Sequence, residues 1–254
     1  MKVLYLDCGM GASGDMLMAA LLELHPDRED FLKRLNGLQI PGVSIRAAAV
    51  EKYGVAGTQI QVAIHGTEEE GGATHGDHPH HHLHSDHSGI GRIVDHLDLP
   101  CEVREDIRAV YEIIAEAESY VHKKPVTMIH FHELGMMDAV ADIAGVCMLM
   151  KELGLDQVLA SPVHVGCGTI RCAHGILPVP APATARILQG IPTCSGSVQG
   201  ELCTPTGAAL LKYFCSGFIP RPCMQVQKSG YGFGKREFGL ANCLCAMIGE
   251  IKDR

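Results

Sequence analysis

The sequence has no long uninterrupted hydrophobic run, no extended basic run and no two cysteines in C-x-x-C spacing. Its longest apolar stretch, 139–150, contains Asp142, and the N-terminal apolar residues reach a charge at Asp7 before a signal-peptide core could form. We therefore expect neither a membrane-spanning helix nor a secretory leader, and we expect a cytoplasmic protein. Because basic runs stop at two residues and the net charge is −8, we expect no nucleic-acid partner.

The eleven cysteines are spread along the whole chain. Without an export signal they are expected to be reduced thiols rather than a disulfide framework. The missing C-x-x-C spacing also gives little support to a structural zinc site. We expect Cys147, Cys215, Cys243 and Cys245 to act as small buried hydrophobic residues.

A length of 254 residues with 46% hydrophobic content is typical of a soluble globular protein. Alternating strand-like and helix-like patterns predict an α/β fold, sandwich-like, with a mixed β-sheet and packed helices, and no internal repeat is present. The strand patterns cover 3–8, 43–50, 58–64, 127–131, 157–165, 224–231 and 242–251. The helical patterns cover 15–24, 27–36, 90–97, 101–122, 138–153, 182–189 and 206–214.

A histidine cluster lies inside a predicted disordered segment at about 68–90. Seven of the thirteen residues from 75 to 87 are histidine: His75, His78, His80, His81, His82, His84 and His87. Neutral imidazole is a common ligand of nickel and other late divalent metals, so the composition predicts metal binding. The irregular spacing suits a flexible arm for storage or delivery better than a fixed coordination cage. The alternative is a solvated insertion without a role.

A glycine-rich turn lies between the first predicted strand and helix. Its residues Gly9, Gly11, Ser13 and Gly14 resemble a dinucleotide-binding turn, but the region that should supply a second strand, 27–36, has a helical pattern. We therefore reject a dinucleotide site. A phosphate or carboxylate site remains open, with Asp7 or Asp15 able to hold a cation, and so does a turn that only packs strand on helix.

The strongest candidate for a fixed site begins at His130. If 127–132 is a strand, two histidines share one face, and two aspartates four residues apart share a face of the next helix. The candidate catalytic residues are His130, His132, Glu133, Asp138 and Asp142. Such a set suits nickel, zinc or iron, or proton transfer. The alternative has Asp138 as a helix cap, Asp142 in solvent and one histidine hydrogen-bonded in the core.

A third group of polar residues lies in the second half of the chain. Cys167, Cys172 and His174 could bind a soft metal, and Arg171 could clamp a phosphate or carboxylate. Thr204 and Thr206 flank a proline at a predicted helix start, where an anion could bind. Ordinary loop structure is the alternative for all of these residues.

Several segments together resemble the LarC family of nickel insertion proteins. The segments are L-Y-L-D-C-G-M-G-A-S-G-D-M, the histidine-rich insertion, F-H-E-L-G-M-M-D-A-V-A-D-I, R-C-A-H-G-I-L-P-V-P-A-P-A-T, G-E-L-C-T-P-T-G-A-A-L-L and S-G-Y-G-F-G, in that order. The resemblance implies nickel insertion into pyridinium-3,5-bisthiocarboxylic acid mononucleotide, which makes the nickel-pincer cofactor of lactate racemase. It also implies a lyase-class, CTP-dependent cyclometallation with manganese or magnesium.

The resemblance covers 1–234 and only the N-terminal part of the family. The segment after Gly234 lacks the R-P-N-x-L-R run of other members, and the family's C-terminal domain, linked to nucleotide binding, is not present. The resemblance therefore implies a single N-terminal domain of a split enzyme, with a separate C-terminal polypeptide as partner and a possible homo-oligomer. Two other hypotheses are a non-catalytic nickel reservoir or chaperone and a metal-dependent hydrolase.

Overall fold

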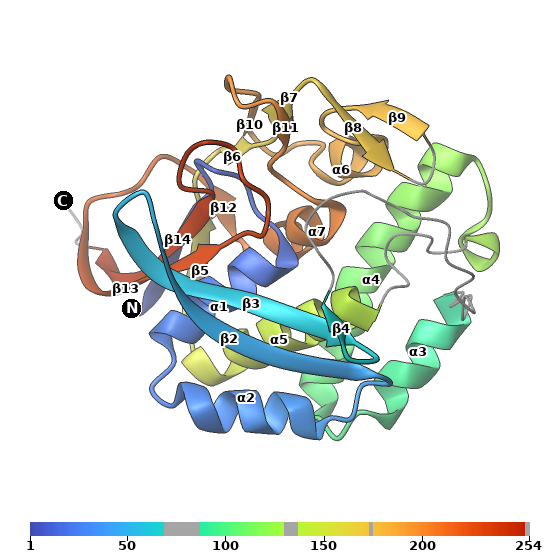
Figure 1. Ribbon diagram of the computed structural model, residues 1–254, viewed down its shortest axis with the longest axis horizontal. Coiled ribbons are helices and arrows are strands. Elements are labelled where there is room, and N and C mark those ends of the chain that lie inside the picture. The colour runs from blue at the N-terminus through green and yellow to red at the C-terminus, as the bar shows by residue number, and fades with distance from the viewer. Residues whose placement is uncertain (69–86, 130–136, 173–174, 252–254) are drawn as a thin grey trace.

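In the computed structural model, residues 1–68, 87–129, 137–172 and 175–251 are described (Figure 1). The helices are α1 (Gly14–Leu24), α2 (Arg28–Gly37), α3 (His87–His96), α4 (Cys101–His122), α5 (Met137–Leu153), α6 (Pro182–Ile187), α7 (Pro205–Phe214) and the 3₁₀ helix η1 (Val126–Met128). The strands of the main sheet are β1 (Val3–Asp7), β2 (Val43–Lys52), β3 (Val55–Ile64), β4 (Thr67–Glu68), β5 (Gln157–Ala160), β12 (Gly217–Phe218), β13 (Met224–Phe233) and β14 (Cys243–Ile251). Six further strands form two-stranded ribbons: β6 (Val163–His164), β7 (Gly166–Cys167), β8 (Thr169–Cys172), β9 (Gly175–Pro178), β10 (Thr193–Cys194) and β11 (Gly200–Glu201).

The main sheet has the order β12-β5-β1-β14-β13-β3-β2, with β4 paired to β3. Strand β1 is parallel to β5 and antiparallel to β14, and β13 is antiparallel to β14 but parallel to β3. The predicted α/β fold with a mixed sheet is therefore confirmed. The short ribbons lie together above the main sheet in the view of Figure 1, next to α6 and α7.

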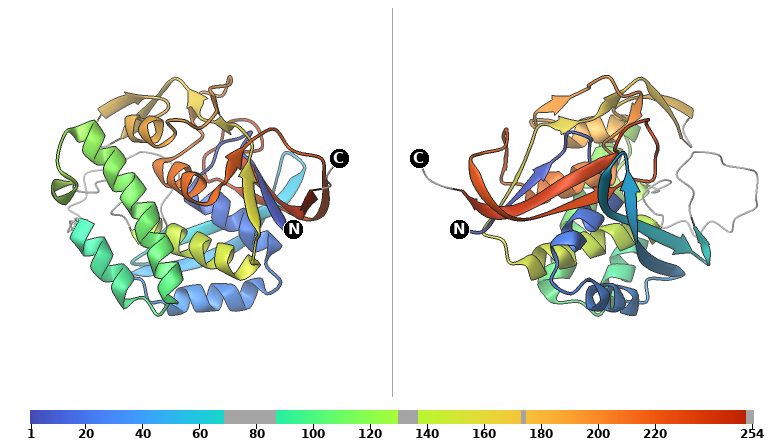
Figure 2. Two further views of the ribbon diagram at one scale, coloured as in Figure 1. Left: turned by 180° about the vertical axis from the view of Figure 1, so that it is seen from behind. Right: turned by 60° about the vertical axis from the view of Figure 1, so that its left-hand side comes forward.

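The main core lies between the sheet and helices α1, α2 and α5. Leu4 and Leu6 of β1 belong to this core, whereas the alternate residues Val3 and Tyr5 join a small cluster on the opposite face. This alternation is the two-residue period of a strand buried on both faces. Figure 2 shows the helices gathered beside the sheet rather than around it.

Helix α1 lies unusually close to the sheet because β13 carries glycine beneath it. A Cβ atom on Gly232 would lie 2.0 Å from the Met16 carbonyl oxygen and 2.5 Å from the Ala20 nitrogen. A Cβ atom on Gly230 would lie 2.2 Å from the Glu23 Cβ. Since real Cβ atoms do not approach backbone atoms so closely, any larger residue at 232 would lift α1 off the sheet.

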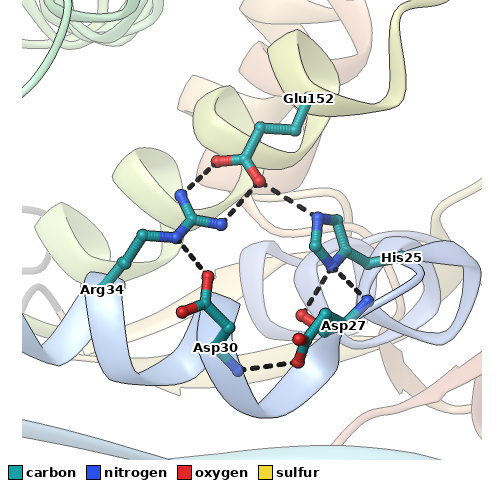
Figure 3. A network of polar contacts seen from close by, with 5 residues as sticks. All are labelled: His25, Asp27, Asp30, Arg34 and Glu152. Carbon is teal, nitrogen blue, oxygen red and sulfur yellow. Dashed lines mark hydrogen bonds and ion pairs between the residues drawn. The ribbon is translucent and has the colours of Figure 1, made fainter.

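A polar network joins the end of α1 and the helix α2 to the end of α5 (Figure 3). The Arg34 guanidinium donates to both carboxylate oxygens of Glu152 at 2.7 and 2.8 Å and, through Nε, to Asp30 at 2.7 Å. The His25 Nε2 lies 3.0 Å from the same Glu152 carboxylate. Hydrogen bonds from Arg34 lower the pKa of Glu152, so this acid stays ionised at neutral pH and holds the helices together.

Several element boundaries differ from the sequence prediction. The strand predicted at 127–131 is wrong where it is described, because Pro125 begins the 3₁₀ turn η1 and the Met128 N–H bonds to its carbonyl. The strand predicted at 157–165 is divided by Pro162, which cannot donate to a neighbouring strand. Helix α3 begins at His87 rather than at the predicted residue 90, and residues 69–86, which make up most of the segment predicted to be disordered, lie outside the described part.

All eleven cysteines are free thiols. Cys147 is fully buried as predicted, whereas Cys215, Cys243 and Cys245 are only half-buried. Cys245 lies on the face of the sheet away from the main core, where the small apolar cluster covers only part of its side chain. Within the described ranges, no helix is both long and apolar enough to cross a membrane.

We predict that Gly232→Ala lowers the free energy of unfolding by about 3 kcal/mol, because the added methyl meets backbone atoms of α1 that cannot move aside separately. Gly91→Ala in α3 is the matched control, since a Cβ there meets nothing within 4 Å, and it should stabilise the protein by up to ~1 kcal/mol. Urea unfolding followed by circular dichroism measures both. Equal stability of the two variants would contradict the close packing of α1.

Candidate functional site

One pocket collects several of the polar residues that the sequence singled out. Its volume is about 310 Å³, which is at the lower end of the range for small-molecule sites. It is formed by the start of α1, the start of α5, the β11–α7 connection and the segment between β13 and β14. The lining residues are Ser13, Gly14, Asp15, Met16, Val62, Asp138, Ala139, Asp142, Glu201, Leu202, Thr204, Pro205, Thr206, Gly234, Lys235, Arg236 and Asn242.

Asp142 is the most unusual group in the pocket. It points from α5 at the first turn of α1, where the Asp15 backbone N–H hydrogen-bonds to its carboxyl group. Gly14 leaves the space for this contact, since a Cβ at that position would lie 2.7 Å from the Asp142 Cβ and Oδ2. The other oxygen, Oδ1, is buried and has no hydrogen-bond partner among the described residues. A buried carboxyl oxygen without a partner is costly unless a proton or a cation compensates it.

The charges around Asp142 also disfavour its ionised form. Burial raises the pKa of Asp142 well above its ordinary value, and the neighbouring carboxylates Asp15 and Asp138 raise it further. The Lys235 ammonium and the Asp15 backbone N–H act in the opposite direction. A divalent cation bound at Asp142 would reverse this balance, because the ionised carboxylate would then be stabilised.

The two neighbouring carboxylates are partly held by their own helix starts. The Ser13 hydroxyl donates to the Asp15 Oδ1, which also accepts the Met16 N–H at 2.9 Å. Asp138 accepts the Ala139 N–H at 2.8 Å in the first turn of α5. Both carboxylates therefore keep a fixed orientation, because each is bonded to the backbone of a helix start.

A basic segment from the β13–β14 connection completes the lining. Lys235 is half-buried, and Arg236 forms an ion pair at 3.5 Å with Glu201, whose side chain is only 5% exposed. The Asn242 Nδ2 donates to the Arg236 carbonyl at 3.0 Å, and its buried Oδ1 has no partner within the described ranges. Lys235, Arg236 and Asn242 were not among the predicted site residues, although Lys235 directly follows the S-G-Y-G-F-G segment.

The glycine-rich turn is tied to the β11–α7 connection. The Gly9 N–H bonds to Asp7 Oδ1 at 3.1 Å, the Gly11 N–H to the Cys8 carbonyl at 2.9 Å and the Ala12 N–H to the Leu202 carbonyl at 3.1 Å. Gly11 has φ of +81°, and a Cβ there would lie 2.0 Å from the Leu202 carbonyl oxygen. Packing thus explains why glycine is needed at 11. The anion site predicted for Gly9, Gly11, Ser13 and Gly14 stays a prediction.

The other predicted site residues are dispersed. Asp7 is not in the pocket lining, and its charge acts instead on Cys243, Cys245 and Tyr231. Arg171 lies on β8 and is exposed, away from the pocket lining. Thr204 caps α7 by accepting the Gly207 N–H at 3.2 Å, and both Thr204 and Thr206 line the pocket, while their role in anion binding stays a prediction.

The remaining candidates fall largely outside the described part of the chain. These are His75, His78, His80, His81, His82, His84, His130, His132, Glu133 and His174, whereas His87 is the first residue of α3. In the described ranges, no three histidine, cysteine, aspartate or glutamate side chains are arranged to hold a metal by themselves. The alternative that placed Asp142 in solvent is wrong, because Asp142 is half-buried, its Oδ1 is inaccessible, and its carboxyl group accepts the Asp15 backbone N–H.

We predict that Asp142→Asn stabilises the metal-free protein at neutral pH. Because the folded-state pKa of Asp142 is raised, the folded protein holds this proton more tightly than the unfolded chain does. Its stability therefore falls as pH rises above the ordinary aspartate pKa of about 4, and asparagine removes this loss. Urea unfolding with a chelator between pH 4 and 8 should show a gap between variant and parent that grows with pH. Parallel profiles would contradict this assignment.

Comparison with known proteins gives one family and several close relatives. The family model described as "Nickel insertion protein" matches residues 4–254. A "Pyridinium-3,5-bisthiocarboxylic acid mononucleotide nickel insertion protein" of Desulfitobacterium hafniense is 40% identical over 254 residues, which is 100% of this chain and 60% of that protein. Proteins with the same name from Geobacillus kaustophilus and Acetivibrio thermocellus are each 39% identical, over 98% and 100% of this chain and 60% and 62% of their own length. No solved structure matches.

Proposed function

The chain belongs to the nickel insertion protein family, and we propose that it inserts nickel into pyridinium-3,5-bisthiocarboxylic acid mononucleotide at the pocket around Asp142. The substrate is the one that the names of its relatives carry. The chain spans about 60% of the length of these relatives. From the family resemblance, we propose that it works as the N-terminal component of a split, lyase-class enzyme.

The partnerless Oδ1 of Asp142 is the observation that carries this proposal. It is a buried acceptor, fixed in direction by the first turn of α1, and it lines a pocket with Asp15 and Asp138. Nickel as the incoming substrate would provide the missing partner. Among the described residues of the lining, most possible metal ligands are carboxylate, hydroxyl and amide oxygens, Met16 adds a thioether, and neither cysteine nor histidine occurs.

An oxygen-lined pocket suits the release of nickel better than its storage. Oxygen ligands hold late transition metals more weakly than thiolate or imidazole ligands do. The two thiocarboxylates named in the substrate offer sulfur, so nickel would gain affinity by moving from the Asp142 side of the pocket to the substrate. The pocket needs no complete set of protein ligands, because the substrate supplies the rest.

Further features of the proposal follow from the family resemblance and the sequence. We propose that CTP, with manganese or magnesium, acts through a separately made C-terminal polypeptide, and that the product serves lactate racemase. We also propose that the histidines of 75–87 collect nickel, and that His130, His132 and Glu133, which precede α5 in the sequence, take part in metallation.

We predict that Asp142→Asn lowers nickel insertion by at least about tenfold, since it removes one charge and one fixed oxygen ligand. The assay is a single turnover of the chain with the C-terminal polypeptide, nickel, manganese, CTP and the thiocarboxylate mononucleotide, scored by nickel in the product. Asp98→Asn, an exposed aspartate outside this pocket, is the control and should retain full activity. Full activity of Asp142→Asn would contradict the proposed site.

Deletion of 69–86 separates nickel insertion from the alternative function as a nickel reservoir. In an insertase, loss of most of the histidine cluster should raise the nickel concentration needed for half-maximal insertion, while the rate at saturating nickel remains. In a reservoir, the same deletion should abolish the effect of the protein at any nickel concentration. Nickel titration of the assay described above distinguishes the two outcomes.

A further inference from the structure

The charged groups of the pocket come from different elements according to their sign. Asp15 and Asp138 lie at the starts of α1 and α5, together with the buried Asp142. Both cations, Lys235 and Arg236, come from the segment that leaves β13. The pocket therefore has three carboxylates on two helix starts and a separate segment that carries the positive charge, in which Arg236 pairs with Glu201 and Lys235 lies near enough to act on Asp142.

The basic segment is held in place rather than free in solvent. Gly234 precedes it and has no room for a side chain, since a Cβ would lie 2.7 Å from the Asn242 Nδ2. Asn242 in turn holds the Arg236 carbonyl, and the Arg236 guanidinium is paired with the buried Glu201. Lys235 lies between these anchored residues, so its backbone is fixed on both sides and its side chain starts at the pocket lining.

We propose that Lys235 and Arg236 bind the phosphate of a pyridinium mononucleotide, and that this contact orients the pyridinium ring toward Asp142. This proposal rests on the proposed function and adds the orientation of the bound mononucleotide. A phosphate carries nearly two negative charges at neutral pH, and its oxygens accept strong hydrogen bonds from lysine and arginine. The phosphate is therefore the part of the ligand that the basic segment fits best.

The opposite orientation is electrostatically unfavourable. It would place the phosphate beside Asp15, Asp138 and Asp142, and an anionic phosphate is repelled by this group of carboxylates. Anionic ring substituents face the same repulsion until a cation lies between them and the carboxylates. A metal at Asp142 can neutralise the ring end, whereas the phosphate end needs charges supplied by the protein itself.

The proposed phosphate contact is tested with two commercial probes and no metal. Nicotinamide mononucleotide has a pyridinium ring with an uncharged ring substituent, and nicotinamide riboside is the same molecule without phosphate. Isothermal titration of the full chain should show that the nucleotide binds about tenfold more tightly than the riboside, which corresponds to about 1.4 kcal/mol. The ratio of the two affinities isolates the contribution of the phosphate.

Lys235→Gln should reduce this ratio to about two- to threefold, since Arg236 remains, while riboside affinity is unchanged. Lys228→Gln is the matched control, because Lys228 is an exposed lysine of the same strand outside the pocket lining. Arg236→Lys keeps a cation beside the buried Glu201 and should give an intermediate ratio. In the nickel insertion assay, Lys235→Gln should raise KM for the mononucleotide and leave kcat nearly unchanged.

Equal affinity of the unaltered protein for nucleotide and riboside overturns the phosphate contact, and so does a Lys235→Gln ratio equal to that of the parent. Neither result bears on the proposed function, which is tested by nickel insertion with Asp142→Asn and with the 69–86 deletion. A fall in kcat without a change in KM for Lys235→Gln would show that Lys235 serves only to neutralise Asp142, and would also overturn the proposal.

Discussion

The burial of the Asp142 carboxyl group against the first turn of α1 is the constraint on which the pocket depends. The contact exists only because residue 14 is glycine, since a Cβ there would meet Asp142 at 2.7 Å. At the other ends of these two helices, His25 at the end of α1 contacts Glu152 near the end of α5. Arg34 of α2 donates to the same carboxylate. Helices α1 and α5 are thereby fastened at both ends and run in the same direction. They join the main core together with the parallel strands β1 and β5.

The Asp142 carboxyl group lowers the stability of the protein but is already oriented within the pocket. An ionisable group with a partnerless buried oxygen destabilises the metal-free fold, and the tight packing of α1 on Gly230 and Gly232 provides the rigidity that keeps it in place. In the proposed function, a rigid surround favours nickel binding, because the carboxylates do not need to be ordered when the cation arrives.

The pocket lining comes from segments that have different structural roles. The turn at Gly11 packs on Leu202, and Ala12 exchanges backbone hydrogen bonds with Leu202 and Thr204, so the first and last quarters of the sequence are connected. The segment after β13 adds the cations. A site built this way has its acidic and basic groups on independently anchored elements, which suits a ligand with a cation-binding end and an anionic end.

Local patterns in the sequence predicted much of the fold. The apolar period of α4 gave its bounds as 101–122, and the alternation of strand and helix patterns predicted the α/β class. The carboxylate pair Asp138 and Asp142 was found by its spacing on a helix. The strand predicted at 127–131 was wrong because Pro125 favours a 3₁₀ turn that a short apolar pattern does not reveal.

By itself, the sequence determined which residues have the chemistry for a metal site: the histidine cluster, the aspartates of α5 and the glycine-rich turn. Only the tertiary structure decided that Asp142 is buried against Asp15, that Asp7 lies elsewhere, and that Lys235, Arg236 and Asn242 line the same pocket. The physical reason is that periodicity along a chain reports only which face of an element is buried. The meeting of α1, α5 and the β13–β14 connection follows from strand pairing between distant segments, which no local pattern records.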